Sequence, residues 1–250
     1  MLAFHFQHVK VRCLEEPMDS LKRLEKLMTR LRSKGGCPWD RRQTHKSLRP
    51  YLLEEAHEVL DAIDGGDPRH LREELGDLLL QVVFHAQMAR ERGQFNLQDV
   101  ARAIGDKLVR RHPHVFGKSS RKISDINRKW EELKRREKPE RKSALDGLPV
   151  SLSSLLRAQR MQDKMGPQPF FPKTAAEVEA KIGSEWKRLK QAGRKKSARN
   201  LEETLGSLLF NLALLANFRG TNAEMSLRKT NRRIGRQFQR LEKAPQKPKA

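Results

Sequence analysis

Residues 51–87 read YLLEEAHEVLDAIDGGDPRHLREELGDLLLQVVFHAQ, and this stretch decides the fold. Apolar residues recur every three or four positions on both sides of Gly65-Gly66. This period predicts one helix from about Ser47 to Asp64 and another from Pro68 to about Arg92. The glycines stop the first helix, and Asp67 caps the second, which has a proline at its first position. We therefore expect two neighbouring helices joined by a tight loop.

Four carboxylates lie on these two expected helices: Glu55 and Glu58 on the first, Glu74 and Asp77 on the second. The i,i+3 spacing places each pair on one face of its helix. Like charges gathered in this way repel one another unless a cation lies between them, and an all-oxygen set of donors suits a hard cation such as Mg²⁺. A solvated face is the alternative for either pair alone. Two pairs on adjacent helices indicate a metal site and chemistry on a phosphate substrate.

The rest of the chain predicts an all-α protein, because helical periodicity begins after Met18 and no segment shows sustained strand alternation. Two units are expected, residues 18–137 and residues 151–242, joined by a charged, turn-rich linker over 138–150. Residues 1–17 are expected to be a disordered extension and residues 243–250 a disordered basic tail. Further helices are expected at about 21–31, 97–111, 124–137, 151–164, 174–192, 198–218 and 222–242.

The composition favours anionic partners. The chain has 250 residues, with 53 Lys and Arg against 31 Asp and Glu, a formal net charge of +22. Nucleotides, nucleic acid or an anionic surface would all complement this charge. Cys13 and Cys37 give no disulfide framework and no zinc ligand set, so a cytoplasmic location is expected. No run of apolar residues approaches transmembrane length, and no membrane partner is expected.

An internal repeat divides the acids into two groups. The segment EELGDLLLQVVFHAQ (residues 73–87) matches ETLGSLLFNLALLAN (residues 203–217) at a constant offset, which indicates two copies of one helical unit. The apolar pattern survives in the second copy where the acids do not. Only the first copy is therefore expected to bind metal. The counterparts of Glu55, Glu58, Glu74 and Asp77 are Glu185, Arg188, Thr204 and Ser207.

Three stretches carry a further signal: GGCPWDRRQTHKSLRPYLLEEAHEVLDAI (residues 35–63), LREELGDLLLQVVFHAQMA (71–89) and DKLVRRHPHVFG (106–117). They resemble the MazG nucleoside triphosphate pyrophosphohydrolases, and the connector ALDGLPVSLSSLLRAQRMQDKMG (144–166) resembles that of members with two copies. The resemblance implies two tandem four-helix units, a homodimer, and hydrolysis of nucleoside triphosphates to a monophosphate and pyrophosphate. It also implies a role in cleaning the nucleotide pool and Mg²⁺ as cofactor, with Mn²⁺ as an alternative.

The family motif, E-E-x-x-E followed by E-x-x-D, identifies the same four acids. The resemblance implies that Glu55, Glu58, Glu74 and Asp77 ligate the metal. It gives Glu54 a catalytic role, either in orienting the attacking water or in supporting a ligand.

The resemblance also implies substrate-binding residues beyond the acids. The family's phosphate-binding pair falls on Lys107 and Arg111, and its W-x-x-x-K pattern falls on Trp130 and Lys134. A triphosphate needs cations beyond the metal, and an aromatic face stacks on a base. A solvated basic helix end remains the alternative for the first pair, and a core position remains the alternative for the tryptophan. Trp39 is expected to hold its loop against the helices.

The second copy departs from the family pattern. Arg188 points toward the former metal site in this interpretation and takes the place of a cation, so the second unit is expected to be catalytically inactive and to serve folding, dimerisation or regulation. Two rival functions stay open. One is a non-catalytic nucleotide sensor or scaffold. The other is a basic nucleic-acid-binding protein, which is not favoured because the chain has few aromatic residues for stacking and no recognised binding motif.

Overall fold

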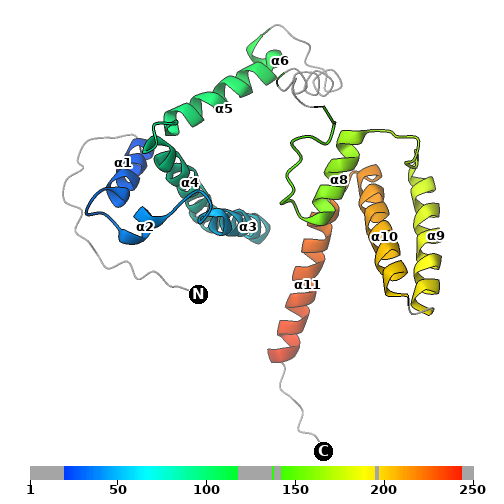
Figure 1. Ribbon diagram of the computed structural model, residues 1–250. Coiled ribbons are helices and arrows are strands. Elements are labelled where there is room, and N and C mark those ends of the chain that lie inside the picture. Colours follow the sequence, from blue (N-terminus) through cyan, green and yellow to red (C-terminus); the bar gives the residue numbers. More distant parts are fainter. Residues whose placement is uncertain (1–19, 118–136, 138–141, 195–196, 244–250) are drawn as a thin grey trace, which may run out of the picture. The chain divides into compact units, whose positions relative to one another are not determined.

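The structure, a computed structural model, describes residues 20–117, 137, 142–194 and 197–243. Every regular element within these ranges is a helix, which confirms the all-α class. The chain divides into two compact units, residues 1–133 and 134–250. In Figure 1 the helices of the first unit are blue to green and those of the second are green-yellow to red. Trp130, Lys134 and the expected helix at 124–137 lie outside the described residues, apart from Glu137.

The two units have corresponding helices. In each unit the two long central helices lie side by side, α3 with α4 and α9 with α10 (Figure 1). The first unit contains α1 (Ser20–Arg32), α2 (Pro38–Arg42), α3 (Arg49–Gly65), α4 (Pro68–Arg90), α5 (Leu97–Arg111) and α6 (Pro113–Phe116). The second contains α8 (Ser154–Met165), α9 (Ala175–Arg194), α10 (Ala198–Phe218) and α11 (Ala223–Lys243).

The turn between α3 and α4 forms as its sequence predicts. Gly66 adopts a left-handed conformation, with φ of 75°, and its N–H donates to the carbonyl of Ala62. Asp67 then caps α4 by accepting a hydrogen bond of 2.9 Å from the backbone N–H of Arg69. A side chain at residue 66 would be strained in this conformation, which explains the glycine. This turn sets the register of the two helices that carry the four acids.

The core of the first unit lies between α1, α4 and the start of α5. Met28, Leu48, Val83, Phe84, Met88 and Leu97 are buried there. The segment after α1 was expected to be a loop, but residues 38–42 form the short helix α2. On α2, Trp39 meets Tyr51 of α3 edge to face, with ring centroids 5.9 Å apart. This contact agrees with the expected structural role of the tryptophan.

Arg32 holds the α2 segment in place. Its side chain, which is 8% exposed, forms a salt bridge of 2.7 Å to Glu91 and lies over the ring of Phe84. The same guanidinium donates to the backbone carbonyls of Asp40 and Gln43. One planar cation therefore joins the ends of α1, α2 and α4, because its donors are fixed in a fork that can serve several acceptors at once.

The internal repeat is visible in the side-chain contacts. Thr29 donates to the Gln87 amide oxygen at 3.0 Å, and the residues 130 positions later, Gln159 and Asn217, form the corresponding hydrogen bond at 2.8 Å. Leu48 and Val178 are likewise equivalent and are among the most buried side chains of their units, at 1% and 0% exposure. The two units therefore share one packing scheme, from α1 through α4 in the first and from α8 through α10 in the second.

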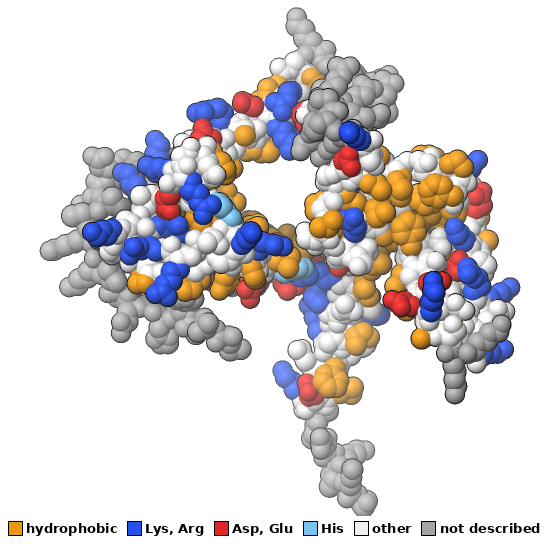
Figure 2. Space-filling view, in the orientation of Figure 1, with side chains coloured by type: hydrophobic (Ala, Val, Ile, Leu, Met, Phe, Trp, Pro, Cys, Tyr) orange, Lys and Arg blue, Asp and Glu red, His pale blue; other side chains and the backbone are white. Residues whose placement is uncertain are grey.

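Both units also present the same apolar stripe to solvent. These residues are between 39% and 49% exposed, and each member on α4 has its counterpart on α10. Figure 2 shows hydrophobic side chains gathered over α9 and α10 in the second unit. No helix among the described residues is both long and apolar enough to cross a membrane. The stripes consist of Leu75, Leu79 and Val82 on α4, and Leu205, Leu209 and Leu212 on α10.

We predict that Arg32→Gln lowers the free energy of unfolding by about 2–3 kcal/mol, because the substitution removes the cationic partner of Glu91 and the guanidinium that donates to two backbone carbonyls. Urea unfolding followed by circular dichroism measures the change. Arg30→Gln, on an exposed position of the same helix, is the matched control and should change stability little. Equal unfolding midpoints for the two variants would show that Arg32 does not hold the segment.

Candidate metal and phosphate site

Three of the four predicted carboxylates converge. One oxygen each from Glu55, Glu58 and Glu74 lies within 4.8 Å of the other two. Glu55 and Glu58 project from successive turns of α3, and Glu74 projects from the first half of α4. Glu74 is only 9% exposed, whereas Glu58 opens to solvent. The site is therefore buried at Glu74 and open to solvent at Glu58, where a ligand can enter.

The acids perturb one another. Burial, and then the negative charges of Asp77 and Glu58, raise the pKa of Glu55 to about 7. A hydrogen bond that the protonated Glu55 carboxyl donates to Glu58, and the charge of Glu74, act in the same direction. Burial and the charge of Glu74 also raise the pKa of Asp77. Asp77 thus belongs to the same electrostatic cluster, and a proton or another cation between the carboxylates is favourable.

The donor set fits a hard divalent cation. All candidate ligand atoms are carboxylate oxygens, which Mg²⁺ and Mn²⁺ prefer, and neither cysteine nor histidine is among the three clustered residues. A divalent ion would replace the mutual repulsion by attraction. Since the open side faces solvent, the coordination sphere has room for water and for phosphate oxygens.

His70 supports the buried side of the cluster. Its Nε2 atom lies 2.8 Å from Glu74 Oε1, one helical turn away on α4. A hydrogen bond to one oxygen of a carboxylate restricts the orientation of the group. His70 was not among the predicted site residues, although its i,i+4 spacing to Glu74 is present in the sequence.

The other predicted site residues that the structure describes, Glu54, Lys107 and Arg111, lie on α3 and α5. Glu54 is exposed on α3 and lies outside the cluster of ligand atoms. Lys107 and Arg111 lie on the last turns of α5, whose first residue, Leu97, is anchored in the core. From that anchor they are roughly 15–20 Å away along the helix. The structure therefore places this pair on the C-terminal half of α5, in the same unit as the carboxylates.

Two histidines extend the acidic face of α3 and α4. His85 lies two turns beyond Asp77 on α4, and its Nδ1 atom is 2.7 Å from Nδ1 of His45. Burial, followed by the charge of His45, lowers the pKa of His85. Between the acids and this pair lies Gln81, which is 6% exposed; its Oε1 and the Nε2 of His85 are buried without a hydrogen-bond partner among the described residues. Gln81 and His85 were not among the predicted site residues. The available signal was their spacing, because they follow Asp77 on α4 at intervals of four residues.

The second unit has a different arrangement at the equivalent position. The Arg188 guanidinium donates to both carboxylate oxygens of Glu185, at 3.1 and 3.2 Å. Thr204 is buried and donates its hydroxyl to the backbone carbonyl of Asn200 on its own helix. A fixed positive charge thus accompanies the one retained acid, and the other former acid positions carry neutral side chains.

The sequence of the chain is similar to known proteins over most of its length. Residues 43–116, which include the four acids and the Lys107–Arg111 pair, match the family model of the MazG nucleotide pyrophosphohydrolase domain. The chain is 44% identical over 225 residues to the Thermotoga maritima protein named nucleoside triphosphate pyrophosphohydrolase/pyrophosphatase MazG, covering 90% of this chain and 86% of that protein. It is also 44% identical over 232 residues to the nucleoside triphosphate pyrophosphohydrolase of Escherichia coli K12, covering 90% and 88%.

These matches identify the class of protein, an all-α nucleotide pyrophosphohydrolase, and more particularly they show that the chain belongs to the MazG family. A solved structure of a MazG-related protein from Thermotoga maritima covers 46% of this chain at 27% identity, with a TM-score of 0.40.

We predict that Glu55→Gln stabilises the metal-free protein at pH 8. Glu55 takes up its proton near pH 4.5 in the unfolded chain but near pH 7 in the folded protein. Its ionisation therefore destabilises the fold increasingly between these values and fully above pH 7. Because the site is partly solvated, we expect a gain of about 1–2 kcal/mol at pH 8 that disappears toward pH 4. Urea unfolding in EDTA across this pH range measures it.

The matched control is Glu185→Gln in the second unit. This substitution removes a carboxylate that already has Arg188 as its partner, so no pH-dependent gain is expected. If both variants gave the same pH profile, carboxylate repulsion would not be the property that distinguishes the two sites.

Proposed function

We propose that the chain hydrolyses nucleoside triphosphates to a nucleoside monophosphate and pyrophosphate, with Mg²⁺ or Mn²⁺, at the site on α3 and α4. The convergence of three carboxylate oxygens within 4.8 Å, with a fourth acid coupled to them, is the observation that carries this proposal. Membership of the MazG family gives the reaction class. We propose nucleotide-pool cleaning as the role of this activity.

The acids of the first unit would hold the cation. Glu55, Glu58, Glu74 and Asp77 provide the oxygen donors, and the hydrogen bond from His70 keeps Glu74 oriented. When bound, Mg²⁺ supplies neutralisation of the charge that develops on the phosphate oxygens. The cluster's open side admits the triphosphate, while its buried side keeps the donors fixed, which lowers the reorganisation needed during the reaction.

Other side chains are proposed to position water and the leaving group. Glu54, next in sequence to a ligand, would orient the attacking water as a general base. Lys107 and Arg111 would bind the departing pyrophosphate when α5 and the substrate come together. We also propose that Trp130 stacks on the base and that Lys134 contacts phosphate, as the family pattern implies.

The second unit is proposed to lack this activity. Its Glu185 is held by Arg188, and neutral side chains stand at the positions of Glu74 and Asp77. A guanidinium bound to both oxygens of the one remaining carboxylate competes with any metal ion for that ligand. The unit then serves assembly or regulation, and the whole chain has one catalytic centre.

We further propose that the protein forms homodimers. Exposed apolar residues at equivalent positions of α4 and α10 form continuous stripes, and such patches mark association surfaces in helical proteins. Burial of these leucine side chains against a second copy would contribute about 25 cal/mol for each Å² removed from water.

We predict that Glu58→Gln or Asp77→Asn reduces turnover on the order of a thousandfold or more, because each removes a negative charge and a metal-ligating oxygen while preserving side-chain shape. Release of pyrophosphate from a panel of nucleoside triphosphates, with Mg²⁺ present, measures the effect. Circular dichroism checks that the helices remain.

The control again comes from the repeat. Glu185→Gln changes the one acid that the second unit retains at these positions, the counterpart of Glu55, and should leave turnover close to that of the unmodified chain. Loss of turnover in this variant, or Mg²⁺-dependent turnover that persists in both first-unit variants, would contradict the assignment of the active site.

We predict that Leu79→Asp in the first unit, combined with Leu209→Asp in the second, shifts the mass in light scattering after gel filtration from a dimer to the single-chain value of 29.0 kDa. A charge placed in a buried apolar interface is strongly unfavourable. Arg72→Asp, exposed on α4, is the control and should keep the dimer. A monomeric wild-type chain would refute the proposed assembly.

A further inference from the structure

The second unit contains a cavity that lies apart from its former metal site. It has a volume of about 450 Å³, in the range of small-molecule sites. Its walls come from the end of α8, the segment 166–173 and the last turns of α10. Asn217, on the cavity wall, lies ten residues beyond Ser207, the position of a former metal ligand, or about 15 Å along α10. The cavity is therefore separate from the retained Glu185.

The cavity exists because the clamp of the first unit has no counterpart in the second. Arg32, which fills the corresponding space in the first unit, is equivalent to Gln162, and Phe84 is equivalent to the smaller Leu214. Thr221 stands near the position of Glu91, the ion-pair partner of Arg32. A planar, hydrogen-bonding guanidinium stacked on an aromatic ring has thus been replaced by open space with an amide at its edge.

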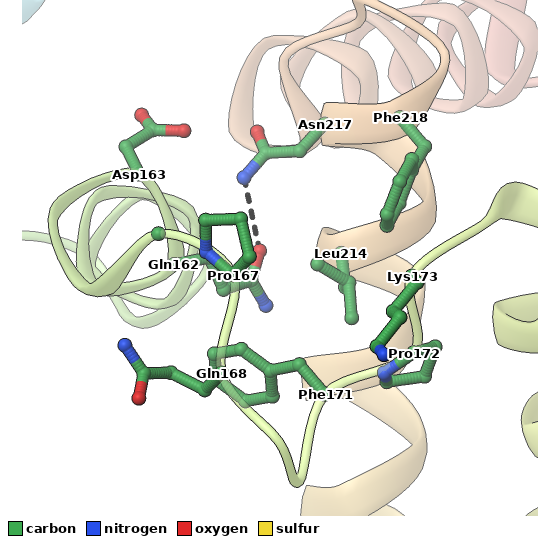
Figure 3. A pocket seen from close by; sticks show the side chains of 11 residues that line it. Gln162, Asp163, Pro167, Gln168, Phe171, Pro172, Lys173, Leu214, Asn217 and Phe218 are labelled. Carbon is green, nitrogen blue, oxygen red and sulfur yellow. Dashed lines mark hydrogen bonds between the residues drawn. The ribbon is translucent and has the colours of Figure 1, made fainter.

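Flat apolar side chains line most of this space. Figure 3 shows Leu214 and Phe218 projecting from α10, with Phe171 and Pro172 entering from the segment that leads to α9. Phe171 is itself fixed by its neighbours, with ring centroids 4.6 Å from Phe170 and 6.0 Å from Phe210. Such walls favour a planar ligand, because aromatic rings and prolines offer contact area without losing much side-chain freedom.

Amides form the polar wall. Gln162, which is 5% exposed, accepts a hydrogen bond of 3.0 Å from Asn217 (Figure 3). It also donates one of 3.1 Å to the carbonyl of Phe210. These bonds fix the amide plane. An amide has two donors and two acceptor positions, so Gln162 retains one N–H and one lone pair beyond these two contacts. A fixed donor beside an acceptor is complementary to the edge of a nucleobase.

The mouth of the cavity favours an anion. Lys173 lies at the rim, and its ammonium group has no carboxylate partner among the residues the structure describes. The rim's acid, Asp163, is already paired with Arg160 at 3.2 Å. A ligand with a flat hydrogen-bonding body and one anionic group therefore matches the walls and the mouth together.

We propose that this cavity binds a nucleoside monophosphate, with the base between Phe171 and Phe218, its edge on Gln162 and its phosphate at Lys173. Nucleoside monophosphates combine the required features, and they are the product class of the proposed reaction. The second unit is then an effector site that senses product. This assignment of ligand class rests on the proposed function, but binding itself does not require turnover.

Hydrogen exchange on the full chain tests the proposal, with AMP, GMP, CMP and UMP as separate probes at millimolar concentration. At least one should slow amide exchange severalfold in residues 162–173 and 210–218. The same protection should persist in Glu58→Gln, which removes turnover, so a failure of the enzymatic proposal is distinguishable from a failure of this one. Absence of protection there with all four probes, or protection confined to residues 51–77, would overturn the effector site.

Variants that restore the first unit's residues give the sharper test. Gln162→Arg with Leu214→Phe should fill the cavity and abolish protection, whereas Gln191→Arg, the same change on an exposed position of α9, should keep it. If the filled variant does not fold, Lys173→Met decides. It should weaken binding of the responsive monophosphate about tenfold, as expected for the loss of one charge-assisted contact, and leave the parent nucleoside unaffected. Undiminished monophosphate binding in either folded variant would refute the proposal.

Discussion

Repulsion between carboxylates across the α3–α4 hairpin is the constraint on which the rest of the first unit depends. The packing of α3 against α4, set by the turn at Gly66, brings Glu55, Glu58 and Glu74 together at a cost that burial increases. Folding tolerates this cost because the apolar core, which includes Val83, Phe84 and Met88 of α4, and the Arg32–Glu91 ion pair stabilise the rest of the unit. The same repulsion between carboxylates favours the binding of a cation, because a positive ion between them replaces repulsion by attraction.

The sequence predicted the helices and the tight turn well, because their signals are local. Gly66 and Asp67 form hydrogen bonds to residues at most four positions away. The period of apolar side chains predicts a helix whichever elements later pack against it. The short helix α2 and the Arg32 clamp escaped prediction for the opposite reason. The guanidinium reaches Glu91, which is 59 residues away in sequence, and nothing in its neighbourhood along the chain specifies that partner.

The predictions for the candidate site also succeeded where the signal is local and failed where the contact is distant in sequence. The i,i+3 spacing predicted that each pair of acids lies on one face of its helix, and the structure brings Glu55, Glu58 and Glu74 together across the two helices. The contact between His45 and His85 could not be predicted, because His45 lies in a connecting segment. Such a segment has no regular period that indicates which way its side chains point. Lys107 and Arg111 show a further limit. Their spacing places both residues on one face of α5, but whether that face meets a substrate depends on packing that the pattern does not contain.

The hydrogen bond shared by the two units has a consequence for engineering. Thr29–Gln87 and Gln159–Asn217 use different side chains in one geometry, so the scaffold has survived while its chemistry diverged. The second unit is accordingly a ready-made frame on which a metal centre can be rebuilt at positions 188, 204 and 207. A chain restored in this way would carry twin reactive centres in one polypeptide. Its original pocket and its reconstructed pocket could then be tuned for different bases without building a new fold.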